Sequence, residues 1–375
     1  MRERNKITSS RYHKPDYYFL LTIFVVVIFG LVMLSSASSV ISFEKFEDSN
    51  YLLRHQLLYG ILIGGIGLII FSRIDYHIWR RFAFPLLVLN ILLLLAVFLP
   101  GIGYGFQGAR RWIQLGPTLL QPTELLKLTF IIYLATLFEK NIMKIKEAGV
   151  GLIPFLIMLG IIVGLIMLQP DMGTMLAISI IGLVIFFLAG APLKHLAWIF
   201  LGATGLFFLL IKIAPYRAAR FTVFLNPALD PQGIGYHVNQ ALLAIGSGGI
   251  FGLGLGHSRQ KYLYLPEVTG DSIFAVIAEE LGLIFCLLLV ILFLIIMYRG
   301  FKIAKAAPDI FGKLLAAGII SWFVLQAFIN IAAMVTLIPM TGIPLPFVSY
   351  GSSALATSLI AVGILINISR QTKES

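Results

Sequence analysis

The hydrophobic and polar positions of this chain alternate in long blocks. Apolar runs of about 18 residues or more recur along the chain, separated by short polar or basic segments. The runs predict ten membrane-spanning helices, at about 17–38, 56–72, 82–100, 122–138, 149–168, 173–190, 196–213, 272–298, 314–338 and 348–368. We therefore predict an all-α polytopic membrane protein with a single ten-helix transmembrane domain over residues 17–368.

The composition agrees with this pattern. Hydrophobic residues make up 59% of the 375 residues and charged residues only 12%, whereas soluble domains have about 45–50% and about 25%. Cys286, the single cysteine, lies in the eighth predicted span, so we expect neither a disulfide framework nor a metal site built from thiols. The glycines at 252, 254 and 256 lack the strand and helix context of a dinucleotide site.

The basic residues predict the orientation. If the N-terminus is cytoplasmic, 18 of the 28 Lys and Arg residues face inward, eight face outward and two lie in spans. This bias predicts a basic cytoplasmic N-terminus, residues 1–16, and a cytoplasmic C-terminus, residues 369–375. Residues 214–271 then form a large extracytoplasmic loop between the seventh and eighth spans. The net charge of +11 is explained by topology, so we expect no nucleic-acid partner.

Two polar motifs lie before and at the start of the fourth span. Glu124 and Lys127 follow Pro122 and are three residues apart, so they would face each other on one helix. The pair either makes two intramembrane charges tolerable or also lines a substrate cavity. Arg110 and Arg111, in the preceding outer segment, are either interfacial anchors or clamps for a phosphate, which suits a guanidinium fork.

Further charged residues mark the outer ends of other spans. Asp171, in a tight turn between the fifth and sixth spans, either caps the sixth helix or contacts a substrate. Arg217 and Arg220 are three residues apart and share one helix face. They either anchor lipid headgroups or recognise a pyrophosphate.

Asp271 immediately precedes the eighth span. It is either the N-cap of that helix, worth about 1 kcal/mol, or a functional carboxylate, because charges at a membrane boundary are energetically expensive. Glu279 and Glu280 follow eight and nine residues later, about 12–14 Å further along a helix. They are too deep to share the proton of Asp271, so we expect them to pair with a lysine or with backbone groups.

Seven motifs occur in order over nearly the whole chain: GARRWIQLG, QPTELLK, LQPDMGT, the segment from YRAAR to DPQGIGY, GSGGIFGLGLGHSRQKYLYLPE, DSIFAVIAEELG and PMTGIPLPFVSYGSS. Together they resemble the SEDS family (shape, elongation, division and sporulation), of the FtsW and RodA type. The resemblance implies ten transmembrane helices with a large outer loop between the seventh and eighth. It also implies a glycosyltransferase that polymerises lipid II into peptidoglycan with a class B penicillin-binding protein and other division or elongation proteins.

The resemblance also implies roles for single residues. The family's essential aspartate matches Asp271, its glutamate and lysine match Glu124 and Lys127, and a second aspartate matches Asp171. Two motifs depart from the family: Thr-Gly-Asp-Ser replaces the usual His-Thr-Asp-Phe, and Tyr-Gly-Ser-Ser-Ala replaces Tyr-Gly-Gly-Ser-Ser. Tyr350 and the QKYLYLPE segment are closer to the division branch, the FtsW type, than to the elongation branch.

The implied reaction needs a base and a source of positive charge. A sugar 4-hydroxyl attacks an anomeric carbon that carries polyprenyl pyrophosphate, so we predict Asp271 as the general base, with inversion at that carbon. Arginines, lysines or a divalent cation, Mg²⁺ or Mn²⁺, would stabilise the leaving pyrophosphate. The predicted substrate-binding residues are Arg110, Arg111, Glu124, Lys127, Asp171, Arg217, Arg220, Gln260, Glu267 and Ser349.

Two other functions fit the same features. A transporter, or flippase, for lipid-linked precursors would also place polar residues in its spans, although no internal repeat is apparent. A non-catalytic scaffold for division proteins is the other alternative. For the enzyme, we expect a location in the cytoplasmic (inner) membrane with the active site outside the cytoplasm.

Overall fold

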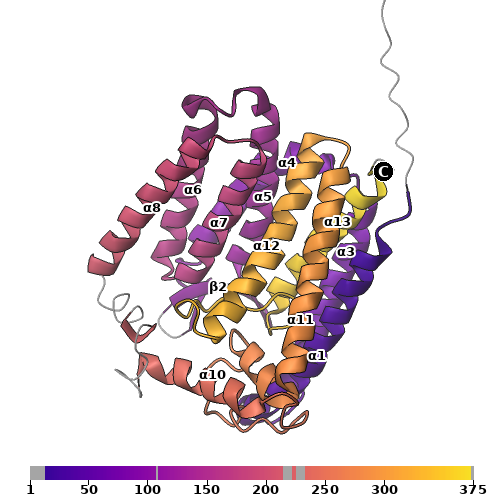
Figure 1. Cartoon of the computed structure of the whole chain (residues 1–375), viewed down its shortest axis with the longest axis vertical. Helices are drawn as coiled ribbons and strands as arrows, with labels where there is room; N and C mark the ends of the chain where they lie inside the picture. The colour runs from indigo at the N-terminus through magenta and orange to yellow at the C-terminus, as the bar shows by residue number, and fades with distance from the viewer. Residues whose placement is uncertain (1–12, 107–108, 214–221, 225–232, 373–375) are drawn as a thin grey trace, which may run out of the picture.

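The computed structural model describes residues 13–106, 109–213, 222–224 and 233–372, which form a bundle of long helices (Figure 1). Most helices run along one common direction, whereas α10 (Ile234–Gly248) crosses one end of the bundle. The first and last described segments meet at the other end, where the His13 amide donates to the Arg370 carbonyl at 2.8 Å.

The helical segments along the bundle are joined by connections of very different lengths. They are α1 (Tyr17–Phe46), α2 (Tyr51–His55), η1 (Gln56–Leu62), α3 (Ile63–Arg73), α4 (Ile78–Ala96), α5 (Pro122–Lys140), η2 (Ile142–Lys144), η3 (Ala148–Leu152), α6 (Ile153–Leu168), α7 (Met172–Leu188), α8 (Leu193–Ile213), α11 (Ile273–Ala306), α12 (Ile310–Met334) and α13 (Ser352–Arg370). The segments α2, η1 and α3 are continuous, and η3 continues into α6, with π-helical turns at both junctions. Every apolar run identified in the sequence overlaps a helix.

In the described part of the chain, seven helices are long and apolar enough to cross a membrane. These are α1, the continuous α2–α3 helix, α4, α6 with its η3 turn, α11, α12 and α13, while α7 is a shorter apolar helix. The protein is therefore a polytopic helical membrane protein, and the number of ten crossings stays a prediction. The last helix begins at Ser352 rather than at 348, because Phe347 has a left-handed φ of 66° and the Tyr350 amide donates to the Thr269 carbonyl at 2.8 Å.

The prediction of an all-α protein is wrong for the segment between α4 and α5. Here β1 (Gly103–Phe106), β2 (Ala109–Leu115) and β3 (Thr118–Leu120) form an antiparallel sheet in that order. The strand β2 buries Ala109 and Ile113, four residues apart on one face. Gly116, with a φ of +60°, forms the tight turn into β3, a conformation that glycine adopts without steric cost.

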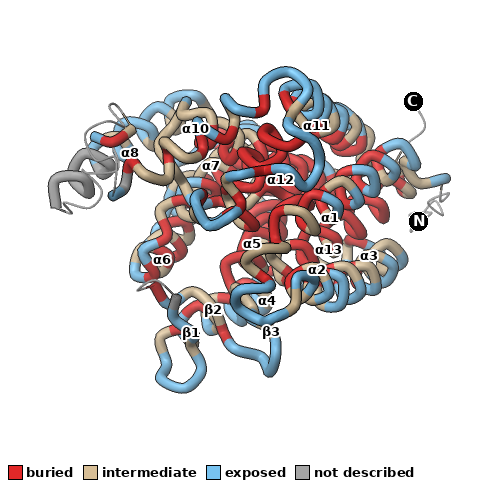
Figure 2. The backbone as a smooth tube through the Cα atoms, turned by 90° about the horizontal axis from the view of Figure 1, so that it is seen from below, coloured by how far each residue is buried: buried red, intermediate tan, exposed pale blue. Residues whose placement is uncertain are grey.

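The centre of the bundle is formed by α5, α12 and α13. In the most apolar 18-residue window of each helix, 78% of α12 and 83% of α13 are buried, against 17% of α2–α3 and 22% of α4. Figure 2 shows the buried backbone gathered in the middle and the exposed residues around it. Bilayer lipid would cover the outer apolar side chains, whereas polar groups on the central helices must find partners within the protein.

Candidate active site

Asp271 lies in a tight turn that leads into α11. Within the turn, the amides of Gly270 and Ser272 donate to the Glu267 carbonyl at 2.9 and 3.2 Å, and Glu267 has a φ of 51°. The N-cap residue of α11 is Ser272. Of the two alternatives for Asp271, the helix cap is therefore wrong, and the functional carboxylate stays a prediction. Ser272 has φ −88° and ψ 2°, which is not a helical conformation, so Ile273 is the first helical residue. Asp271 is half-buried and Glu267 is exposed.

The backbone of this turn is fixed from α12 and from the start of α13. Asn330 Nδ2 on α12 donates to the carbonyls of Asp271 and Ile343, at 2.7 and 2.8 Å. Ser349 Oγ donates to the Gly270 carbonyl at 2.6 Å. Ser349 is buried beneath the turn, so this predicted substrate-binding residue contacts the turn itself.

A histidine on α10 also reaches this turn. His237 Nε2 lies 2.6 Å from Ser272 Oγ, which in turn donates to the Pro266 carbonyl at 2.8 Å. Gly342 also lies close to the carboxylate, because a Cβ added there would lie 3.8 Å from Asp271 Oδ2. Segments that are far apart in the sequence therefore meet at this turn.

The predicted ion pair of α5 is confirmed. Lys127 Nζ lies 2.9 and 2.8 Å from the two carboxylate oxygens of Glu124, and both side chains are 3% exposed. Lys127 also donates to Gln326 Oε1 at 2.8 Å and lies 5.0 Å from the centre of the Trp322 ring. Gln326 Nε2 then donates to the Pro344 carbonyl at 2.8 Å. Polar contacts therefore lead from the ion pair to the segment beside Asp271.

Trp322, Gln326 and Asn330 were not identified from the sequence. They are spaced by four residues, so they share one face of α12. A glutamine and an asparagine one turn apart within a predicted span are a signal for this polar face, because such side chains need partners in a membrane.

Arg111 and Asp171 both organise the turn between α6 and α7. Arg111 donates to the carbonyls of Gln169 and Pro170, at 3.1 and 2.5 Å, and its Nε lies 3.9 Å from Asp171 Oδ2. The predicted helix cap is confirmed, since Asp171 accepts from the Thr174 amide at 3.0 Å at the start of α7. Arg111 is therefore used to hold this turn.

Arg110 is the other member of the basic pair. It lies on β2, as does Arg111, but its side chain is exposed, and successive strand residues point to opposite faces. The other two predicted arginines, Arg217 and Arg220, lie outside the described residues.

A buried carboxylate cluster connects the segment between α10 and α11 to two helices. Lys261 Nζ lies 3.0 Å from Glu280 Oε1, and Ser36 Oγ of α1 donates to the same oxygen at 2.7 Å. Glu279 accepts from Ser258 Oγ at 2.5 Å. We call Ser36, Ser258, Lys261, Glu279 and Glu280 the carboxylate cluster. The expectation that the two glutamates pair with a lysine and with backbone groups is confirmed.

Gln260 is held by this cluster. Its backbone amide donates to Glu279 Oε2 at 3.3 Å, and the neighbouring backbone amide of Arg259 donates to Glu279 Oε1 at 2.9 Å. Its side-chain oxygen is buried without a hydrogen-bond partner among the described residues. Whether Gln260 contacts a substrate stays a prediction.

The helix α11 is interrupted at Gly282, which has φ 76° and ψ −175°. Four hydrogen bonds replace the interrupted ones: Leu253 N–H to Glu279 O (2.9 Å), Gly254 N–H to Glu280 O (2.9 Å), Leu283 N–H to Gly249 O (3.0 Å) and Ile284 N–H to Ile250 O (3.4 Å). The segment 249–254 thus satisfies the backbone groups that the break exposes. Asp271 stands at the start of the short half-helix that this loop holds.

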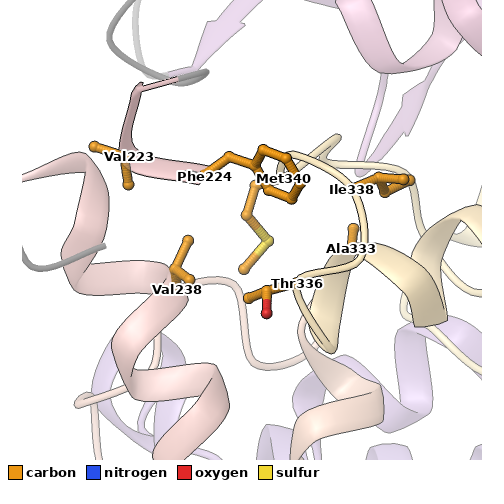
Figure 3. Close-up of a pocket in the computed structure, with 7 residues that line it drawn as sticks. All are labelled: Val223, Phe224, Val238, Ala333, Thr336, Ile338 and Met340. Carbon is orange, nitrogen blue, oxygen red and sulfur yellow. The ribbon is translucent and has the colours of Figure 1, made fainter. Parts of the chain in front are cut away.

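An apolar pocket lies beside the turn (Figure 3). It is lined by Val223, Phe224, Val238, Ala333, Thr336, Ile338 and Met340. Met340 points between Phe224 and the α10 residue Val238. Residues 340–342 lead from this pocket to Asp271, so an apolar surface and a carboxylate lie next to each other.

The described residues contain no group of three or more His, Cys, Asp or Glu residues that could hold a metal ion. Asp271 and Glu267 belong to one turn, and carboxylate oxygens are ligands that Mg²⁺ and Mn²⁺ prefer. Such a cation would therefore need further ligands from the phosphates of a substrate.

Fold and site together define a polytopic helical membrane protein with a half-buried aspartate at one end, supported by buried polar side chains from the central helices. A family model described as "Cell cycle protein", for FtsW, RodA and SpoVE, matches residues 16–374. The chain belongs to this family.

Known relatives cover almost all of the chain. A probable peptidoglycan glycosyltransferase FtsW of Trichlorobacter lovleyi is 42% identical over 96% of this chain and 94% of the relative. Stage V sporulation protein E of Bacillus subtilis is 42% identical over 96% of this chain and 98% of the relative.

Two solved structures share the fold. One comes from a study of how a peptidoglycan synthase complex coordinates polymerization and crosslinking. It has a TM-score of 0.77 and 26% identity, with 95% of this chain and 98% of that chain covered. The rod shape determining protein RodA of Thermus thermophilus has a TM-score of 0.70 and 27% identity, with 99% of this chain and 100% of that chain covered.

Proposed function

We propose that the chain is a peptidoglycan glycosyltransferase of the FtsW type, which polymerises lipid II at the outer face of the cytoplasmic membrane. Its family supports this function, as does the relative named as a probable peptidoglycan glycosyltransferase FtsW. The observation that carries the mechanism is the half-buried Asp271, on a turn fixed by Asn330 and Ser349.

In the proposed reaction, Asp271 accepts the proton of a sugar 4-hydroxyl as that oxygen attacks the anomeric carbon of the donor. The bond from that carbon to the polyprenyl pyrophosphate breaks in the same displacement, which inverts the α-linked donor to a β-linked product. A positioned general base contributes about 10²–10⁴-fold to such a step. The fixed backbone of the turn keeps the carboxylate from moving away from the hydroxyl.

The leaving pyrophosphate needs positive charge. Arg110 is exposed on β2, and Arg217 and Arg220 follow in the proposed outer loop, so we assign these three to the phosphates. Arg111 and Lys127 act indirectly, because each already binds protein carbonyl or carboxylate oxygens. Bound to the phosphates and to Asp271 or Glu267, a divalent cation would supply further charge stabilisation.

The proposed orientation places both termini in the cytoplasm and Asp271 outside. Its support is the excess of basic residues in the inner segments, and the meeting of the two chain ends opposite the turn that carries Asp271. A class B penicillin-binding protein is the proposed partner, since a similar solved chain comes from a peptidoglycan synthase complex.

A transporter of lipid II is the second candidate, favoured by the break in α11, because broken helices surround the binding sites of many transporters. An assay that combines the purified protein, its partner and purified lipid II distinguishes the enzyme from the transporter. The enzyme should form glycan polymer that a gel resolves, and Asp271→Ala should form none while it still binds the partner. Movement of labelled lipid II across the vesicle membrane without polymer formation would instead favour the transporter. The absence of both activities would favour a scaffold.

A further inference from the structure

A second cleft lies at the end of the bundle opposite Asp271. It has a volume of about 250 Å³, and Leu188, Ala304, Lys305, Lys313, Leu314 and Ala317 are among the residues that line it. These residues come from the C-terminal ends of α7 and α11 and from the first turns of α12, which lies between the other two helices (Figure 1).

The cleft has apolar walls and two positively charged side chains. Apart from Lys305 and Lys313, every residue that lines it is apolar. Both lysines are exposed, and neither has an ion-pair partner within the described ranges. Two arginines at the same end are paired instead, Arg299 with Asp16 at 2.7 Å and Arg80 with Glu139 at 2.9 Å. The cleft therefore combines an apolar interior with two uncompensated positive charges.

This combination matches the two chemical parts of an anionic phospholipid. An acyl chain fits between apolar walls, and ammonium groups at the end of the helices attract a phosphate in the headgroup layer. A soluble phosphate would use the lysines alone and would leave the apolar walls without a partner. A lipid uses both parts, so the structure favours a lipid over a soluble anion.

We propose that the cleft between α7, α11 and α12 binds an anionic phospholipid, with one acyl chain against Ala304, Leu314 and Ala317 and its phosphate between Lys305 and Lys313. The lipid belongs to the leaflet at the end opposite Asp271. This site is separate from the proposed active site, so its occupancy is testable without any activity assay.

The test measures lipid binding to the purified full-length chain by native mass spectrometry. Palmitoyl-oleoyl phosphatidylglycerol and palmitoyl-oleoyl phosphatidylcholine, which share their acyl chains, are titrated into the wild type, Lys305→Gln with Lys313→Gln, and Lys144→Gln with Lys146→Gln. The control lysines are exposed in the connection between α5 and α6 and do not line the cleft. The wild type and the control variant should prefer phosphatidylglycerol. In the cleft variant, the affinity for phosphatidylglycerol should fall by about 5-fold for each lysine that is removed.

A second variant tests the apolar half of the site. Ala317→Leu keeps both lysines and fills part of the cleft, so it should weaken binding of both lipids. Equal loss of phosphatidylglycerol binding in the control pair, or no loss in the cleft pair, would overturn the proposal. Displacement of the lipid by millimolar inorganic phosphate would also overturn it, because the site would then be one for a soluble anion.

Discussion

Two buried groups of charges support the same end of the molecule in different ways. In the first, Glu124 and Lys127 lie on one turn of α5, with opposite charges 2.8 Å apart. In the second, Lys261, from the segment between α10 and α11, lies 3.0 Å from Glu280 of α11, and Glu279 adds a second carboxylate. The first group is neutral within a single helix, whereas the second joins three segments and has one lysine for two carboxylates.

This difference shows what each group does for the fold. In the α5 pair each charge compensates the other, and Lys127 donates to Gln326. Removal of both side chains therefore leaves few buried polar groups without a partner. Within the carboxylate cluster, Lys261 Nζ also donates to Ser36 Oγ and to the Gly256 carbonyl, at 3.0 and 2.7 Å. It therefore fastens the loop to α1 and to the short half-helix that begins after Asp271.

The largest effect is expected from Lys261→Met. The variant leaves two buried carboxylates without a cation, and breaking a buried pair costs about 3–5 kcal/mol. Cys286, the only cysteine, is buried four residues after the break in α11. Its reaction with a thiol-specific dye during heating therefore measures unfolding, and the midpoint should fall by several degrees. An unchanged midpoint would show that the cluster does not hold the loop.

A smaller effect is expected when both partners of the α5 pair are removed. Glu124→Gln or Lys127→Met alone leaves one buried charge and should destabilise by about 3–5 kcal/mol. The double variant should recover most of this loss, because Gln326 Oε1 keeps the Trp322 N–H donor at 2.7 Å. The same thiol assay gives the midpoints. A double variant that folds and also polymerises lipid II normally would make the pair purely structural.

The smallest effect concerns a half-exposed cluster at the opposite end. Hydrogen bonds to Asp309, and secondly to Asp75, raise the pKa of His77 from 6.5 to about 9. The stabilisation by protonated His77 is complete below about pH 6.5 and is lost as the pH rises through about 9. Solvent screening reduces it to about 1 kcal/mol. The wild type should lose slightly more stability than His77→Gln between pH 6.5 and 9.5, and parallel profiles would contradict this.

The sequence predicted those parts of the site that depend on local spacing. Glu124 and Lys127 were predictable because residues three apart meet on a helix, and Asp171 because its turn precedes a helix. The break in α11 at Gly282 was not predictable, because glycine is common inside membrane helices and no local signal distinguishes a glycine that breaks a helix. Lys261 could not be chosen as the partner of Glu280, because that contact depends on how distant segments meet. The alternative that Asp271 caps α11 is wrong, because the conformation of the local turn makes Ser272 the N-cap.

The central claim is that Asp271 is a base rather than a structural residue. Asparagine keeps the size and hydrogen-bonding oxygen of aspartate but cannot accept the proton. The direct measurement is polymer formation from lipid II by the wild type, Asp271→Asn and Glu267→Gln, each with the partner transpeptidase. The unfolding midpoint of each protein is measured from Cys286.

We expect Asp271→Asn to keep the midpoint and partner binding of the wild type and to lose about 10²–10⁴-fold in polymerisation rate. Glu267→Gln, altered four residues away in the same turn, should lose much less. A well-folded Asp271→Asn protein that polymerises at the rate of the wild type would contradict the account, and a large loss in Glu267→Gln alone would move the base to Glu267.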